Sequence, residues 1–393
     1  MPSDPFLSLS DSLPARRVGV LSTYPPSMCG LATFSAALVA ELILAGDEVE
    51  VVVIDDGRDN SAWAQPAAMR LRNGVPSSVA STIVRLSSCD VVIVQHEYGI
   101  FGGPDGDEVL EVLAGLEVPA IVVLHTVPVH PSDHQRFVLE AVCDLAARVV
   151  VMTNTAGERL ADGYRVDPSK VALIPHGATP PRPTDASTTA SDQHPLRLLT
   201  WGLLGPGKGI EHVLDALSLV KDVRRPIHYT VAGATHPKVF ARDGDLYRNS
   251  LLAQARLLGV SSAVSFDDGY RNVADLMQFV ATSSVVVLPY ESRDQVTSGV
   301  LVDAIAAGRP VIATAFPHAK ELLSDGAGIV VPHGDRAALA GAIRRTADDP
   351  DLLASMVARA RELAPSLTWN AVAGQYRALC AGLAPATTGT AAT

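Results

Sequence analysis

Short runs of Val, Ile and Leu alternate with helical stretches along the whole chain. Val91–Val94 and Val285–Leu288 are unbroken aliphatic segments, as expected for strands that are buried on both faces. Strands of this kind belong to parallel sheets that helices cover on both sides. The repeated β–α alternation therefore predicts an α/β fold with two Rossmann-like, doubly wound domains.

The predicted strands are spread over both halves of the chain. Those in the first half are Val18–Thr23, Glu48–Asp55, Val91–Glu97, Ala120–Thr126, Arg148–Thr153 and Val171–Gly177. Those in the second half are Arg197–Gly202, Ile227–Gly233, Ala263–Gly269, Ser283–Tyr290, Arg309–Phe316 and Gly328–Pro332. Ligands of open α/β sheets bind beyond the carboxyl ends of the strands, so we expect functional residues in the loops that follow them.

The length of 393 residues suits two domains of ordinary size. We assign residues 1–180 to an N-terminal Rossmann-like domain and residues 196–365 to a C-terminal one. Residues 181–195 are rich in Pro, Ser, Thr and Asp, which indicates a linker. We expect a C-terminal helix within residues 366–384 and a disordered tail over residues 385–393.

The composition excludes several classes of protein. The net charge of -11 opposes binding to nucleic acid or to an anionic lipid surface. The four cysteines lack metal-ligand and Cys-x-x-Cys spacing, which is typical of free thiols in a reducing cytosol. There is no signal-peptide pattern, and no apolar run approaches the roughly 18–20 residues of a membrane helix. We therefore predict a cytoplasmic protein with no nucleic-acid partner and no transmembrane segment.

A glycine-rich segment follows the first strand of the second half. It runs from Gly202 to Gly209 and contains Gly207 and Lys208. Glycines let the backbone approach a phosphate closely, and a lysine supplies a mobile positive charge. The spacing nearly matches a P-loop, but Gly209 stands where an NTPase needs Ser or Thr to hold magnesium. The alternative to phosphate binding is a plain β–α turn with an exposed lysine.

A second candidate segment begins at Gln295, after another predicted strand. Thr297 or Ser298 is a natural N-cap, which predicts a helix from Gly299. Such a helix presents free backbone amides and the positive end of its dipole to an anion. Asp303 lies on the same helix face, one turn further on, where a carboxylate can bind a ribose diol. The alternative is an ordinary capped helix with Asp303 in solvent.

Two loops in the first half are weaker candidates. Gly30 lies between the first strand and the first helix, in a segment without the GxGxxG fingerprint, which disfavours a dehydrogenase. His96, Glu97 and Tyr98 follow a central strand and suit contact with a sugar or an acceptor. The alternatives are a simple loop at Gly30, and His96 and Glu97 as hydrogen-bonding supports. His318, which follows a strand in the second half, is a further candidate to line the ligand-binding cleft.

Four ordered segments together resemble the family 4 retaining glycosyltransferases, which have the GT-B architecture of two Rossmann-like domains facing a cleft. The matching segments are Ile174–Gly177, Gly202–Gly209, Gln295–Asp303 and Gly308–Ala313, and the similarity covers roughly residues 18–363. The resemblance implies that the N-terminal domain faces the acceptor and the C-terminal domain the nucleotide-sugar donor. It also implies that the helix within 366–384 packs back on the N-terminal domain.

The resemblance implies a role for each matching residue. Lys208 is implied to neutralise the leaving diphosphate, and Asp303 to bind the ribose hydroxyls. Gln295 and His125 are implied to contact the donor sugar. The residues implied to lie against the donor through their backbone or caps are Gly30, Gly202, Gly207, Thr297, Ser298 and Gly299.

Three positions depart from the family pattern. Leu203 replaces an arginine of the phosphate loop, Gln295 replaces the first glutamate of a Glu-x7-Glu motif, and Asp303 replaces the second. The neighbouring Glu291, Arg293 and Asp294 are candidates to supply the missing charges.

The predicted activity is transfer of a hexose from a GDP- or UDP-sugar to a carbohydrate or other hydroxyl acceptor. Lys208 and the helix start supply the positive charge, so we predict neither a metal nor a cofactor. Two Asp-x-Asp stretches, Asp105–Asp107 and Asp243–Asp245, fit turns better than metal sites. The alternatives are a nucleotide-sugar epimerase of the same fold and a non-catalytic nucleotide-sugar-binding protein.

Overall fold

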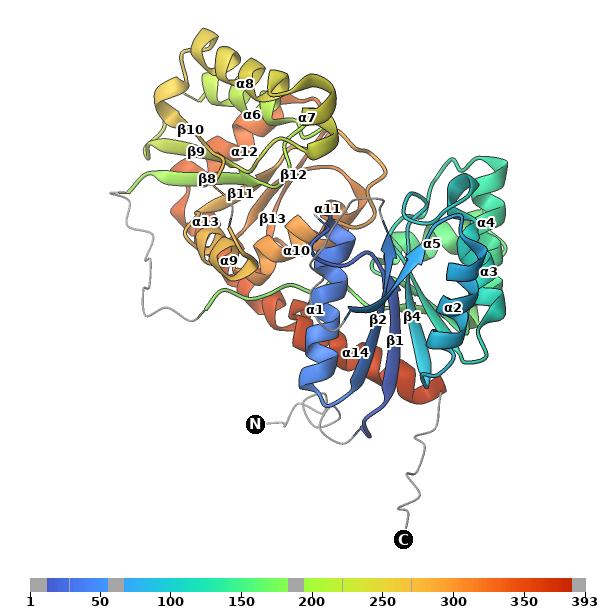
Figure 1. Ribbon diagram of the computed structural model, residues 1–393. Coiled ribbons are helices and arrows are strands. Elements are labelled where there is room, and N and C mark those ends of the chain that lie inside the picture. The colour runs from blue at the N-terminus through green and yellow to red at the C-terminus, as the bar shows by residue number, and fades with distance from the viewer. Residues whose placement is uncertain are drawn as a thin grey trace, which may run out of the picture. The chain divides into compact units, whose positions relative to one another are not determined.

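The chain forms two compact units, which we describe separately (Figure 1). The first comprises residues 1–177 and 369–393, and the second residues 178–368. The computed structural model describes residues 13–27, 29–55, 67–182, 194–220, 222–269 and 271–383. Most of the predicted linker and the whole predicted tail lie outside these residues.

The first unit is built on a seven-stranded sheet in the order β3-β2-β1-β4-β5-β6-β7. Its strands are β1 (Arg17–Ser22), β2 (Glu48–Asp55), β3 (Ala67–Arg72), β4 (Val91–His96), β5 (Ala120–Leu124), β6 (Arg148–Val151) and β7 (Val171–Leu173). Every neighbouring pair is parallel. The order reverses between β1 and β4, so the loops after these two strands flank the switch point, where such sheets bind ligands.

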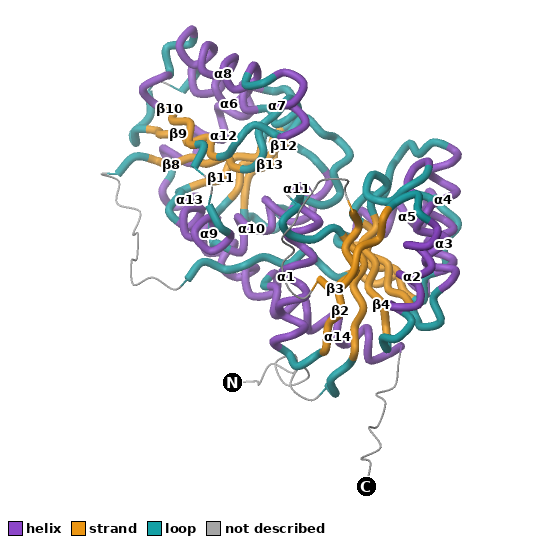
Figure 2. The backbone as a smooth tube through the Cα atoms, viewed as in Figure 1, coloured by secondary structure: helices purple, strands orange, loops and turns teal. Residues whose placement is uncertain are grey.

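Helices cover both faces of this sheet, as Figure 2 shows in purple against orange strands. They are α1 (Gly30–Leu44), α2 (Pro76–Leu86), α3 (Glu108–Gly115), α4 (Asp133–Leu145), α5 (Asn154–Gly163) and α14 (Trp369–Leu383). The last helix packs against α1, and both bury their apolar faces in one core with β1, β2, β4 and β5. A buried ion pair from Arg377 Nε to Asp47 Oδ2, 2.8 Å long, ties α14 to the start of β2.

The second unit is built on a six-stranded parallel sheet in the order β10-β9-β8-β11-β12-β13. Its strands are β8 (Leu196–Trp201), β9 (Ile227–Ala232), β10 (Val264–Asp267), β11 (Val285–Leu288), β12 (Val311–Thr314) and β13 (Gly328–Val331). Here the order reverses between β8 and β11. The two predicted phosphate-binding segments lie in the connections that follow these two strands, so they meet at the switch point of this sheet.

Eight helices of the described chain cover the second sheet. They are α6 (Ile210–Ser218), α7 (Pro237–Asp243), α8 (Leu246–Leu257), α9 (Val273–Ala281), α10 (Gly299–Ala306), α11 (Pro317–Leu322), α12 (Arg336–Asp348) and α13 (Pro350–Leu363). Two separate apolar clusters lie on the two faces, one with α6, α8 and α12 and the other with α9, α10 and α13. The short 3₁₀ turns of both units are η2 (Pro104–Gly106), η3 (Pro168–Lys170), η4 (Ser261–Ala263) and η5 (Ala364–Leu367).

The doubly wound α/β architecture predicted from the sequence is confirmed in both units. One strand was missed: β3 pairs with β2 at the edge of the first sheet. Its sequence, AAMRLR, lacks β-branched residues, and its Arg70 pairs with Asp55 at 3.9 Å. An edge strand with this composition carries no periodic signal, so only the neighbouring strand specifies it. None of the helices that the structure describes has the length and hydropathy needed to span a membrane.

Candidate active site

The glycine-rich turn after β8 packs closely against the loop after β11. Gly207 and Gly209 have φ values of +87° and +67°, which L-residues rarely adopt. A Cβ atom on Gly209 would lie 1.8 Å from the carbonyl oxygen of Pro289. The amide of Glu291 donates to the oxygen of Gly207 at 3.0 Å. Gly209 is therefore required for the close approach of the two candidate segments, whereas Gly207 is favoured by its positive φ alone.

Lys208 holds an uncompensated positive charge in this turn. Its Nζ lies 4.8 Å from the centroid of the Tyr290 ring, a cation–π contact that leaves the ammonium charge unpaired with any carboxylate of the described residues. Burial lowers the pKa of Lys208 from its ordinary value. An anionic ligand beside this half-buried ammonium would stabilise its charged form and offset the effect of burial on its pKa.

The helix predicted from the second segment begins where expected. Helix α10 starts at Gly299, and its N-cap Ser298 accepts a hydrogen bond through Oγ from the amide of Leu301 at 3.3 Å. The amides of Gly299 and Val300 have no partner within the helix, as in the first turn of any α-helix. They remain available to an anion at this end of the sheet, where the helix dipole adds a partial positive charge.

His318 braces this helix start in a way that the sequence did not reveal. Its Nδ1 accepts the amide hydrogen of Ser298 at 2.9 Å, and its own amide donates to the oxygen of Gln295 at 3.4 Å. The side-chain amide of Gln295 donates to the oxygen of Thr297 at 3.0 Å. The Ser298 amide is therefore used inside the protein, and His318 is a buried support at the base of α11.

One buried hydroxyl in the segment before α10 has no hydrogen-bond partner among the described residues. The Oγ1 atom of Thr297 is buried and has no hydrogen bond within the described part of the chain. Glu291, a candidate for extra charge, pairs with His212 at 3.1 Å. A ligand hydroxyl or phosphate oxygen within hydrogen-bond distance would satisfy Thr297, because buried polar groups without partners cost free energy.

Asp303 lies one turn into α10, partly buried, and receives no hydrogen bond or ion pair on its carboxylate from the described residues. Burial raises the pKa of this carboxyl to about 7, far above its ordinary value of 3.8. A carboxylate that has lost water and has no donor is suited to the paired hydroxyls of a ribose, which would replace the lost hydrogen bonds.

The raised pKa of Asp303 predicts a pH-dependent stability. Between pH 3.8 and about 7 the folded chain keeps a proton that the unfolded chain has released, so the free energy of unfolding falls as pH rises. The total loss is roughly 2–4 kcal/mol and levels off above the folded pKa. Asp303→Asn has no carboxyl to titrate, so its free energy of unfolding should not show this fall. Melting curves at pH 4 to 8 should show the variant gaining on the wild type across this window, and a constant difference would contradict the raised pKa.

His125 is placed at the end of β5 in the first unit. Its Nε2 hydrogen-bonds the Oε1 of Gln95 at 2.6 Å, and its ring meets Phe34 edge-on at 5.1 Å between centroids. Burial and then the neighbouring His176 and His96 lower the pKa of His125 to about 3. The imidazole is therefore neutral at physiological pH and offers a hydrogen bond rather than a charge.

His96 at the end of β4 is buried, and Glu97 and Tyr98 after it form hydrogen bonds within the first unit. His96 is fully buried, and neither ring nitrogen has a partner in the described part of the chain; burial lowers its pKa to about 4. Glu97 accepts hydrogen bonds from Thr126 Oγ1 and from the amide of Tyr98, while Tyr98 donates to Gln135 O at 3.2 Å. This arrangement favours the supporting role over direct contact, and contact with a sugar stays a prediction.

Gly30 is the exposed first residue of α1, capped by Cys29, whose sulfur accepts the amide hydrogen of Ala32 at 3.4 Å. The loop after β1 therefore ends in a second open helix start. The space where a Cβ of Gly30 would lie is empty. A role for Gly30 against the donor stays a prediction.

The Asp-x-Asp stretches form turns that are closed by side-chain contacts. Asp105, with φ of +47°, contacts Nδ1 of His134 at 3.0 Å, and Asp107 contacts Nε2 of the same ring at 3.5 Å. Asp243 pairs with Arg242 at 2.6 Å. Over the described residues there is no group of three or more His, Cys, Asp or Glu arranged to hold a metal ion.

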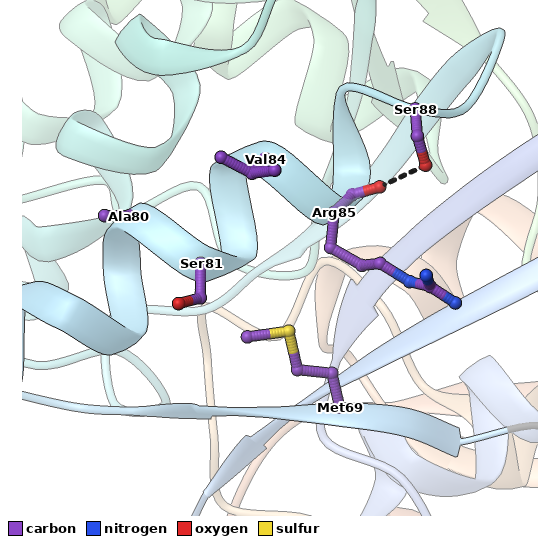
Figure 3. A pocket seen from close by; sticks show the side chains of 6 residues that line it. All are labelled: Met69, Ala80, Ser81, Val84, Arg85 and Ser88. Carbon is purple, nitrogen blue, oxygen red and sulfur yellow. Dashed lines mark hydrogen bonds between the residues drawn. The ribbon is translucent and has the colours of Figure 1, made fainter.

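A shallow pocket in the first unit contains none of the predicted site residues. It lies between α2 and β3 and is lined by Met69, Ala80, Ser81, Val84, Arg85 and Ser88 (Figure 3). Its one charged side chain, Arg85, forms an ion pair with Glu50. We therefore assign no part of the active site to it.

Solved structures share the fold of the whole described chain. The structure of Anabaena HepE in complex with UDP superposes with a TM-score of 0.74 at 18% identity, covering 93% of this chain and 100% of that one. Sucrose-phosphate synthase from Thermosynechococcus elongatus gives 0.73 at 19% identity, covering 94% and 100%. The two sheets and their switch points therefore define a protein of the GT-B fold.

Part of the second unit matches a family model, and the chain is similar in sequence to named glycosyltransferases. Residues 195–349, within the second unit, match the family model described as Glycosyl transferases group 1. D-inositol 3-phosphate glycosyltransferase of Streptomyces scabiei is 30% identical over 239 residues, or 57% of this chain and 51% of the relative. Alpha-D-kanosaminyltransferase of Streptomyces kanamyceticus is 25% identical over 290 residues, or 67% and 71%. The chain thus spans about half the length of the first of these curated relatives.

Proposed function

We propose that this chain is a retaining glycosyltransferase that moves a hexose from a nucleoside diphosphate sugar to a hydroxyl acceptor. One observation carries the proposal. At the switch point of the second sheet, the ammonium of Lys208 has no carboxylate partner among the described residues, and it lies in the turn that packs against the loop leading to α10. An uncompensated cation beside an open helix start is a site for a diphosphate.

The chemistry follows from where charge develops. Breaking the bond between the sugar and the diphosphate leaves negative charge on the diphosphate and positive charge on the sugar. Lys208 and the amides of Gly299 and Val300 would stabilise the leaving group, and they are held in place before the reaction by the glycine turn and by His318. These groups supply the positive charge without a metal ion, so we propose metal-independent transfer.

The nucleoside would be held by Asp303, whose carboxylate receives no hydrogen bond from the residues that the structure describes. A carboxylate accepts hydrogen bonds through two oxygens, so it suits the two neighbouring hydroxyls of a ribose, which donate. The bases to test first are uracil and guanine, and the HepE structures were obtained with UDP and UDP-glucose. The contacts predicted for His125, Gln295 and Gly30 with the donor sugar or phosphates remain part of this proposal, as does a cytosolic location.

The proposal is tested by donor turnover. We expect UDP- or GDP-hexoses to raise the melting temperature, because a ligand that binds only the folded chain stabilises it. With a panel of carbohydrate and polyol acceptors, we expect release of the nucleoside diphosphate and a product whose anomeric configuration, read by NMR, matches that of the donor. An inverted product would refute the retaining mechanism.

Two other outcomes would identify a different function. Conversion of the donor sugar to its epimer without an acceptor would identify an epimerase of the same fold. Nucleotide-sugar binding without turnover over the whole acceptor panel would support a binding protein, for which Leu203 and Gln295 are the changes to examine first.

A further inference from the structure

Three arginines gather at the amino-terminal end of the second sheet, opposite the edge that holds Lys208. The register pairs Val285 of β11 with Leu198 of β8, and Val286 with Val311 of β12. Arg197 comes one residue before Leu198, and Arg309 comes two residues before Val311. The two arginines therefore lie level with each other, on either side of the start of β11. The strands involved are β8, β11 and β12 of Figure 1.

The third arginine comes from α13, which packs on α10. The side chain of Arg361 passes directly over Gly308, the residue before Arg309. A Cβ atom on Gly308 would lie 3.0 Å from Cγ and 3.6 Å from Nε of Arg361. Gly308 also has φ of +65°, which favours glycine, and an added Cβ would crowd the side chain of Arg361.

The three guanidinium groups carry charge without compensation. Within the described residues, none of them forms an ion pair or a side-chain hydrogen bond, and the Nε of Arg309 is buried with no acceptor. Burial, and then the positive charges of Arg361 and Arg197, lower the pKa of Arg309 to about 10. The nearby Arg359 differs, because it pairs with Asp325 and Glu362 at 2.8 and 2.7 Å.

We propose that Arg197, Arg309 and Arg361 bind a small phosphate-bearing molecule at a site distinct from the donor site. Planar guanidinium forks match phosphate oxygens in pairs, and three of them suit a group with more than one negative charge. A ligand of this kind would end the repulsion between the arginines and provide an acceptor for the buried Nε of Arg309. The net charge of -11 makes an unpaired basic cluster of this kind stand out against the rest of the chain.

A purely structural role makes the opposite prediction. Basic residues near a helix C-terminus stabilise the helix dipole, and Arg309 follows the end of α10 closely. Under that explanation, replacing Arg309 or Arg361 lowers stability. Under the binding proposal, removing one of three repelling charges leaves the melting temperature of the ligand-free chain unchanged or higher.

The site is tested with inorganic pyrophosphate and the full chain. Titration calorimetry of the wild type should show two binding events, because the donor site also takes a diphosphate. Lys208→Ala should remove one event. Arg309→Gln combined with Arg361→Gln should weaken the other at least about 10-fold, a loss expected for charge-assisted pairs. Arg359→Gln is the matched control and should keep both events.

Melting curves provide the second measurement, in the Lys208→Ala background. Pyrophosphate should raise the melting temperature by about 2–5 °C at saturating concentration. Adding Arg361→Gln should abolish this shift without lowering the melting temperature of the ligand-free chain. A shift that persists in the Arg361 variant, or a single binding event that Lys208→Ala removes completely, would overturn the proposal. Neither measurement requires transferase activity, so a failure of this proposal can be distinguished from a failure of the proposed function.

Discussion

Replacing Lys208 with alanine is expected to reduce turnover about 100- to 1,000-fold, the usual effect of removing one preorganised group that stabilises a developing anion. The ammonium of Lys208 lies over the Tyr290 ring and has no carboxylate partner in the described chain, so its charge is free to act on the diphosphate. The loss should appear in kcat at saturating donor, because the charge on the leaving group grows in the transition state.

Two controls separate this effect from a folding defect. Lys238→Ala removes an exposed lysine of α7 in the same unit and should leave turnover unchanged. The melting temperature of Lys208→Ala should equal or exceed that of the wild type, since burial already disfavours the charged form of this side chain. Full turnover in Lys208→Ala at saturating donor would remove the basis of the proposed mechanism.

Gly209→Ala is expected to destabilise the second unit by about 3 kcal/mol or more, through a positive φ and overpacking. The added Cβ would lie 1.8 Å from the carbonyl oxygen of Pro289, which is backbone and cannot rotate away. The loops after β8 and β11 would have to separate, so donor binding should be lost as well. In calorimetry, the unfolding transition of the second unit should shift down by about 6–12 °C.

Gly207→Ala is the matched control for this change. Gly207 also has a positive φ, of +87°, but the space where its Cβ would lie is empty. Only the backbone strain of about 1–2 kcal/mol applies there. Equal losses in the two variants would show that conformational strain alone accounts for the effect, and that the contact between the two loops is not tight.

The sequence predicted the central strands well, because burial on both faces requires unbroken runs of Val, Ile and Leu. The predicted strand Glu48–Asp55 coincides with β2, and the helix predicted to start at Gly299 does so, with Ser298 as its cap. Predictions failed where the signal was not local. The edge strand β3 owes its conformation to pairing with β2, and its own residues favour a helix as much as a strand.

The candidate site was predictable in part. Lys208, Ser298 and Asp303 stand out because glycines, a cap and helical spacing leave a local pattern. The contact by which His318 supports the start of α10 leaves no local pattern, because its Nδ1 accepts a hydrogen bond from the amide of Ser298, twenty positions away in the sequence. Likewise, nothing near His96 in the sequence shows that its ring is fully buried with no hydrogen-bond partner in the described part of the chain.

The sequence by itself therefore determined the α/β class, the placement of most strands and helices, and the loops that carry the phosphate-binding candidates. These depend on residue periodicity, glycine and caps, which act within a few residues of each other. Only the tertiary structure decided which polar groups are satisfied and which charges remain open: the cation of Lys208 over Tyr290, the desolvated carboxylate of Asp303, and the three arginines around Gly308. Those states depend on distances between residues far apart in the chain, and on how much water each group loses when the chain folds.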